Sequence, residues 1–152
     1  LGKALGGGVL PVSAVVGRKE VMGLFKPGCH GSTFGGNPLA CAVGLEALNV
    51  LTEEGMVENS ATLGEYMLTQ LRGINSPLIR AVRGKGLWIG VDFEPKRVSA
   101  RKICEMMMAK GVLSKETHET VVRFAPPLTI TKEEIDWALN TFREVLRELE
   151  AG

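Results

Sequence analysis

The amino-acid sequence predicts a chain of α/β class in two parts, a glycine-rich N-terminal part and an α+β domain whose helices cover one face of a small sheet. Two observations support this division. Ten of the 19 glycines fall within the first 36 residues, where loops and short strands are therefore expected. After residue 55, apolar segments with helical period alternate with apolar segments short enough to be strands.

The N-terminal part is expected to open with loops and one strand. Residues 9–16 are apolar enough for a buried strand, and a turn is expected at 26–28. A glycine at position 55 ends this part. We therefore place a domain boundary there, which gives domains over 1–54 and 55–152.

One long helix closes the N-terminal part. Asn37 and Pro38 supply an N-cap and a proline at the first helical position, so a helix is expected from Pro38 to about residue 51. Glu46 is its only charged residue. Because a helix that is apolar nearly all round needs neighbours on every side, most of its faces are expected to be buried.

The second domain is expected to be an alternation of helices and short strands. In order, these are a helix over 57–71, strands over 79–82 and 87–93 around a turn at 83–86, a helix over 99–109, strands over 112–114 and 121–124, and a final helix. That helix begins after a capping box from Thr131 to Glu134. The apolar stripes of the first and last helices comprise Val57, Leu63, Met67, Leu68 and Leu71, and Ile135, Leu139, Phe142, Val145, Leu146 and Leu149.

Composition excludes several classes of function. The net charge is +1, so neither nucleic acid nor a membrane is expected as a partner. The apolar run over 39–45 is far too short to span a bilayer. Three cysteines without CxxC spacing argue against a disulfide scaffold or a zinc ribbon and favour a cytoplasmic protein. The sequence opens with Leu-Gly-Lys, and we expect a fragment of a longer protein.

Lys3 is the first candidate for chemistry. A nucleotide P-loop is excluded because its glycines precede the lysine and Ser or Thr follows it, whereas Ala4 follows here. A lysine between small residues in a glycine loop can instead form a Schiff base with a planar cofactor. A solvated surface lysine remains the alternative.

The second candidate is the segment 30–38, which precedes the long helix. Ser32 and Thr33 offer hydroxyl and backbone N–H groups there, an arrangement that can bind an anion. A capped turn without any ligand is the alternative. His30 has no second ligand at metal spacing, so we expect a loop or core histidine and no metal site.

The third candidate is Arg123, which lies in an apolar strand. Burying an unpaired guanidinium is costly, so a carboxylate partner is expected. That partner is either a structural acid or a substrate carboxylate bound by both arms of the guanidinium group. Arg83 could play either part, but a tight turn between two strands explains it more simply.

These candidates lie in four motifs that together resemble one family. They are Leu-Gly-Lys-Ala-Leu-Gly-Gly-Gly followed by Pro-Val-Ser-Ala, His-Gly-Ser-Thr-Phe-Gly-Gly-Asn-Pro, Arg-Gly-Lys-Gly-Leu and Val-Arg-Phe-Ala-Pro-Pro-Leu. Their order and intervals resemble those of the class III, pyridoxal-phosphate-dependent aminotransferases. The segment Lys-Glu-Thr-His-Glu-Thr over 115–120 most resembles the ornithine aminotransferases of bacterial type. Acetylornithine aminotransferases, the near relatives, usually lack that segment.

The resemblance implies the C-terminal portion of a fold-type I pyridoxal-phosphate-dependent transferase. Residues 1–54 would end the large cofactor domain, and 55–152 would form the small α+β domain. By that match Lys3 forms the Schiff base with pyridoxal 5'-phosphate and then moves a proton between substrate and cofactor. Thr33, with Ser32 beside it, reaches the cofactor phosphate of the neighbouring subunit, so a homodimer is expected.

The implied reaction is transamination of ornithine with 2-oxoglutarate to glutamate 5-semialdehyde and glutamate. Arg123 matches the arginine that receives the carboxylate of 2-oxoglutarate or glutamate. The acetylornithine and 4-aminobutyrate aminotransferases remain alternatives, as does a non-catalytic module with the same fold. The family's other cofactor-binding residues precede the lysine, so the chain by itself is expected to be inactive.

Overall fold

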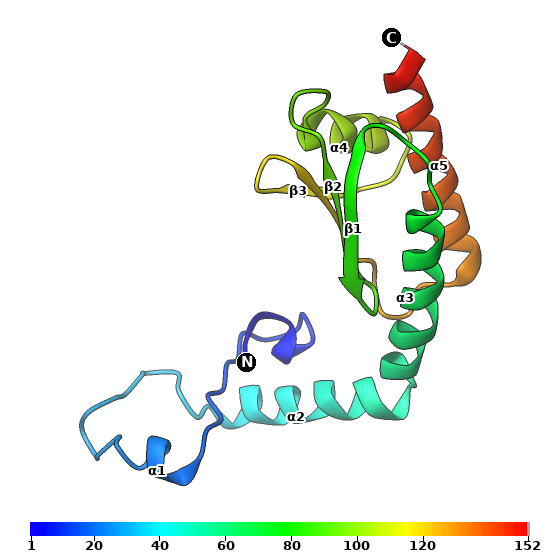
Figure 1. The fold of residues 1–152 in the computed structure, drawn as a ribbon. Coiled ribbons are helices and arrows are strands. Elements are labelled where there is room, and N and C mark those ends of the chain that lie inside the picture. The colour runs from blue at the N-terminus through cyan, green and yellow to red at the C-terminus, as the bar shows by residue number, and fades with distance from the viewer. Residues whose placement is uncertain (152) are drawn as a thin grey trace. The chain divides into compact units, whose positions relative to one another are not determined.

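A computed structural model describes residues 1–151 and divides the chain into two compact units, Leu1–Gly55 and the residues from Met56 onward. Figure 1 gives the order of the elements along the chain. Within residues 1–151, no helix combines the length and apolarity needed to cross a membrane.

The N-terminal unit consists of three helical elements joined by loops. These are the 3-10 helix η1 (Lys3–Gly6), the short helix α1 (Lys19–Met22) and the long helix α2 (Pro38–Glu53). The predicted start of α2 is confirmed, since the Asn37 side chain accepts hydrogen bonds from the N–H groups of Leu39 at 2.9 Å and Ala40 at 3.2 Å. The helix ends two residues beyond the predicted position.

The predicted strand over 9–16 is wrong. The segment begins in a turn at Val9, continues without regular structure and belongs to no sheet, and Val15 and Val16 are exposed. Its links to another segment are two hydrogen bonds between Leu1 and Ala14, from the Leu1 amino group at 2.8 Å and to the Leu1 carbonyl at 3.0 Å. A strand needs a neighbouring backbone along its length, and no such neighbour lies within the described part of this unit.

Most of the surface of α2 is exposed in this chain, as we expect when its neighbours in a longer protein are absent. Only Ala40 and Gly44 are buried along the helix, while Leu39, Leu45 and Leu48 are exposed. A β-carbon at Gly44 would meet the Val12 side chain at 3.4 Å and the Leu5 carbonyl at 3.7 Å, on the side where η1 packs. The rest of the apolar surface of α2 has no neighbour within this unit.

The second unit is a four-stranded antiparallel sheet with three helices. The strands are β1 (Ile79–Lys85), β2 (Trp88–Phe93), β3 (Lys115–Thr117) and β4 (Val121–Phe124), in the order β1-β2-β4-β3. The helices are α3 (Met56–Arg72), α4 (Ala100–Ala109) and α5 (Lys132–Ala151). Alternate strand residues such as Ile89, Val91 and Val122 are fully buried against the helices. The opposite face of the sheet carries no helix of this unit.

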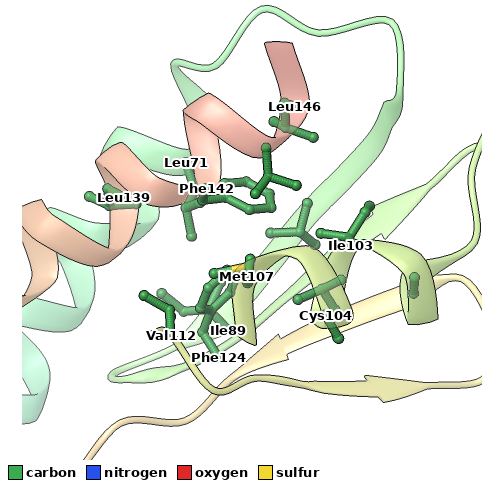
Figure 2. Packing of buried hydrophobic residues seen from close by; sticks show 14 of the residues in the cluster. Leu71, Ile89, Ile103, Cys104, Met107, Val112, Phe124, Leu139, Phe142 and Leu146 are labelled. Atoms are coloured by element: carbon green, nitrogen blue, oxygen red, sulfur yellow. The ribbon is translucent and has the colours of Figure 1, made fainter. Parts of the chain in front are cut away.

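The core lies between the helices and the sheet, as Figure 2 shows. Phe142 of α5 packs edge-on against Phe93 and Phe124, with ring centroids 6.2 and 5.4 Å apart. The predicted α5 stripe is confirmed, with Leu149 only partly buried. The capping box is confirmed too, because the Thr131 N–H donates to Glu134 at 2.8 Å and the Glu134 N–H donates to the Thr131 hydroxyl at 3.3 Å.

Three local predictions in this unit need correction. The strand expected over 112–114 is instead β3 at Lys115–Thr117, because the Val112 N–H bonds to the Met107 carbonyl and so ends α4. The turn expected at 83–86 is shorter, since β1 continues to Lys85 and pairs it with Trp88. Val57 is 55% exposed and does not belong to the buried stripe of α3.

Candidate cofactor and substrate site

A cavity of about 550 Å³ lies in the N-terminal unit. The loop after η1 and the segment that leads into α2 form its walls. Lys3 and Ser32, two residues singled out from the sequence, both line it, as do Phe34 and Cys41. Thr33 is exposed and is not part of the lining. The structure therefore brings Lys3 and Ser32 to one cavity, with Thr33 at its edge.

The backbone at Lys3 is strained. Its φ of +54° lies in the left-handed region, which costs a residue with a side chain roughly 1–2 kcal/mol. The loop around it is closed by the two hydrogen bonds between Leu1 and Ala14, and Gly6 within it is buried. Strain that the surroundings enforce is more frequent at functional sites than at ordinary surface positions.

The segment before α2 combines a helix cap with unused hydrogen-bond donors. Asn37 already pairs the first N–H groups of α2, so the helix end itself has none to offer. Within residues 1–151, the N–H groups of Ser32, Thr33 and Phe34 donate to no protein acceptor. With the two hydroxyl groups they make a set of donors that an anion could occupy. The predicted cap is confirmed, and the anion site stays a prediction.

Arg123 lies on β4, on the face of the sheet that has no helix. Its neighbour Val122 is fully buried among the helices. Because successive side chains of a strand point to opposite faces, the Arg123 side chain points to the face without helices. It is half-buried, and no carboxylate within residues 1–151 lies within 4.0 Å of it. The structural acid expected as one possible partner is therefore not found in the described chain.

Sequence reasoning missed Asp92, the buried acid of this sheet. A β-bulge between Ile79 and Ala81 adds Arg80 opposite Asp92, and Arg80 Nη2 lies 2.5 Å from Asp92 Oδ2. Arg83 Nη1 lies 3.7 Å from the same oxygen, so Arg83 is a strand residue beside an acid rather than a turn residue. An aspartate within the apolar run over 87–93 was the available signal.

The charges around Asp92 determine its titration. Burial acts to raise the pKa of Asp92, but hydrogen bonds from Arg80 and Thr120 and the positive charges of Arg80 and Arg83 outweigh it, so this pKa lies below the usual 3.8. Asp92 Oδ1 is buried and has no hydrogen-bond partner among the described residues. The carboxylate is therefore ionised at neutral pH and holds the two arginines near β2.

His30 lies outside both sites. It is exposed, and its ring centroid is 6.0 Å from that of Phe25. Within the described range of 1–151, no group of three His, Cys, Asp or Glu side chains is arranged to hold a metal ion.

Known proteins resemble this chain along nearly its whole length. The family description "Aminotransferase class-III" matches residues 1–146. An ornithine aminotransferase from Halalkalibacterium halodurans is 57% identical over 148 residues, which are 97% of this chain and 36% of that relative. The chain thus spans little more than a third of the length of that relative.

Solved structures resemble the chain as well. An ornithine aminotransferase from Toxoplasma gondii, described with partial occupancy of PLP at its active site, is 42% identical with a TM-score of 0.91, and the match covers 99% of this chain and 36% of that one. An acetylornithine aminotransferase from Elizabethkingia anophelis is 40% identical with a TM-score of 0.87, over 97% and 39% of the two chains. By the extent of the family match and the identity of these relatives, this chain belongs to the class III aminotransferases.

Proposed function

We propose that the chain is part of an ornithine aminotransferase, which converts ornithine and 2-oxoglutarate to glutamate 5-semialdehyde and glutamate. The name of the 57% identical relative, ornithine aminotransferase, supports ornithine as the amino donor. So does the Lys-Glu-Thr-His-Glu-Thr segment over 115–120. The observation that carries the proposal is the strained Lys3 at the cavity wall with Ser32, in a chain of this family.

The residues of the N-terminal unit fit pyridoxal 5'-phosphate. Lys3 Nζ would hold it covalently, and the donors at Ser32 and Thr33 would bind the phosphate held by the neighbouring subunit. When bound, the cofactor supplies the electron sink for the carbon that bears the amino group. Lys3 Nζ, once released, would move the proton at that carbon. Binding the phosphate held by a neighbouring subunit requires a homodimer, and we propose that its subunits are cytoplasmic, with 1–54 in the large domain and 55–152 in the small one.

Arg123 would bind a carboxylate of 2-oxoglutarate or glutamate. Its guanidinium group has no acid beside it within residues 1–151, and its planar fork matches the two oxygens of a carboxylate. Binding by two parallel hydrogen bonds orients the substrate as well as holding it. Arg123 thus contributes position and charge, while the bond changes occur at the cofactor.

Amino-donor specificity of the whole protein tests the proposal. The initial rate is measured with 2-oxoglutarate and ornithine, N-acetylornithine or 4-aminobutyrate in turn. We expect kcat/KM for ornithine to exceed that for each of the other donors by at least about tenfold, the discrimination a few altered contacts supply. A preference for N-acetylornithine would contradict the proposal and favour the function of the Elizabethkingia relative. Absence of transamination with every donor would favour a non-catalytic module.

A further inference from the structure

Two cations face each other directly across β3 and β4. Lys115 is the register partner of Arg123, and Arg123 is in turn the partner of Gly90 on β2. Directly opposed residues of an antiparallel pair have Cβ atoms roughly 4.5–5.5 Å apart. Glu116, the next residue along β3, bonds to Arg101 of α4, so Lys115 points to the other face, the one that carries Arg123. Both positive side chains therefore share the open face of the sheet.

Neither cation has an ion-pair partner among residues 1–151. Asp92, the buried acid of this face, is bonded to Arg80 and lies 3.7 Å from Arg83. Within residues 1–151, no carboxylate lies within 4.0 Å of Lys115 or Arg123. Like charges that oppose each other directly destabilise a sheet. A bound anion between them would remove that cost.

The strand next to Arg123 contributes no side chain at the matching register position. Arg123 is opposite Gly90 on β2, Gly90 is in turn opposite Arg83 on β1, and Lys115 is exposed on the outer strand β3. A β-carbon at position 90 would meet the Val121 side chain at 3.2 Å, so a larger residue would crowd this part of the face. This register row thus runs Arg83, Gly90, Arg123 and Lys115, and its positive charge favours a small anion as ligand.

We propose that Lys115 is a second carboxylate-binding residue, which together with Arg123 holds one carboxylate of the dicarboxylic substrate. The proposal rests on the function proposed above, in which Arg123 receives that carboxylate. Lys115 adds a point charge beside the planar fork of Arg123 and so favours dicarboxylic over uncharged or cationic substrates. It lies in the 115–120 segment that most resembles the ornithine aminotransferases of bacterial type.

The test compares Lys115→Gln with Lys85→Gln in the whole protein. Lys85 is an exposed lysine on the same sheet, so its variant controls for a general loss of positive charge. Two quantities are measured, the KM for 2-oxoglutarate and the dissociation constant of glutarate, a dicarboxylate without the reacting oxo group. We expect Lys115→Gln to raise the KM for 2-oxoglutarate and the dissociation constant of glutarate by about 5–10-fold and to leave the KM for ornithine unchanged. Lys85→Gln and Lys115→Arg are expected to resemble the wild type in all three quantities.

The outcomes separate this inference from the proposed function. Three results would overturn the role of Lys115. They are unchanged glutarate binding in Lys115→Gln, an equal rise of the glutarate dissociation constant in Lys85→Gln, and a wild type that binds no glutarate. The role of Lys115 would also be overturned if both Lys115→Gln and Lys115→Arg lost glutarate binding. Loss in both variants would indicate altered folding rather than loss of a positive charge. A further outcome combines two results: Lys115→Gln loses glutarate binding and Lys115→Arg retains it, while the wild type does not transaminate ornithine. That outcome would support the carboxylate site and contradict the proposed function.

Discussion

Arg123 is the residue whose role can be changed most selectively. Arg123→Lys keeps the charge but loses the planar fork that binds two carboxylate oxygens. We expect the variant to weaken use of 2-oxoglutarate by about 1–3 kcal/mol, the range for hydrogen bonds to charged groups. Steady-state kinetics and thermal melting are measured together. Unchanged kinetics with a lowered melting temperature would instead assign Arg123 a structural role.

Asp92 gives a prediction about pH. Because its pKa is lowered in the folded state, its contribution to stability is present above the unfolded pKa of about 3.9 and is lost as pH falls through the folded value. Asp92→Asn should therefore lower the unfolding free energy at neutral pH and flatten the loss of stability below about pH 4. Arg80 is 54% exposed, so water screens the ion pair between Arg80 and Asp92. We therefore expect Asp92→Asn to lower the unfolding free energy at neutral pH by about 1 kcal/mol.

Melting temperatures of the Asp92→Asn variant and the wild type are compared from neutral to acidic pH. Parallel curves over the whole range would show that Asp92 does not carry the pH dependence.

Residue type and neighbours were enough to single out Lys3, Ser32 and Arg123 from the sequence. Asp92 was not found in that way, because its pairing with Arg80 depends on a β-bulge that puts two residues of β1 opposite one of β2. The pairing of Lys115 with Arg123 likewise depends on strand register, which a single sequence does not determine.

Among the elements, α3 and the β1–β2 turn approach each other closely at Gly64 and Gly86. A β-carbon at Gly64 would lie 2.2 Å from the Gly86 carbonyl carbon, so one of the two backbones would have to move. We expect Gly64→Ala to cost about 1–3 kcal/mol of unfolding free energy, the usual penalty for overpacking. Gly73→Ala, near the end of the same helix and with ordinary contacts of 3.5 Å, is the control. Equal denaturation midpoints for the two variants would contradict this account.

The elements also show what a single sequence can determine. Helix ends were predicted well at Asn37, Ser99 and Thr131, because caps and apolar stripes depend on residues within one or two turns. The prediction of a strand over 9–16 was wrong because a strand forms only beside a second strand, and the local sequence does not show whether one is present. The strand predicted to begin at Val112 was wrong because the Val112 N–H, which follows the turn at Gly111, donates to the Met107 carbonyl and ends α4.

At the scale of the whole molecule, the two units are predicted to differ in stability. The unit from Met56 has a core of its own, whereas α2 leaves Leu39, Leu45 and Leu48 exposed. The 152-residue chain by itself should therefore associate through α2, bind no pyridoxal phosphate and be cleaved by protease mainly before Gly55. Limited proteolysis with light scattering and a cofactor titration measures all three. A monodisperse monomer, protected from Leu1 onward, would contradict this prediction.

The identity of the cofactor lysine tests the central claim most directly. In the whole protein, reduction with borohydride in the presence of pyridoxal 5'-phosphate should attach the cofactor permanently, and peptide mapping should locate it at Lys3. Lys3→Ala should abolish both the adduct and nearly all turnover, while Lys85→Ala should affect neither. A cofactor trapped at Lys26 or Lys85, or undiminished labelling of Lys3→Ala, would contradict the account.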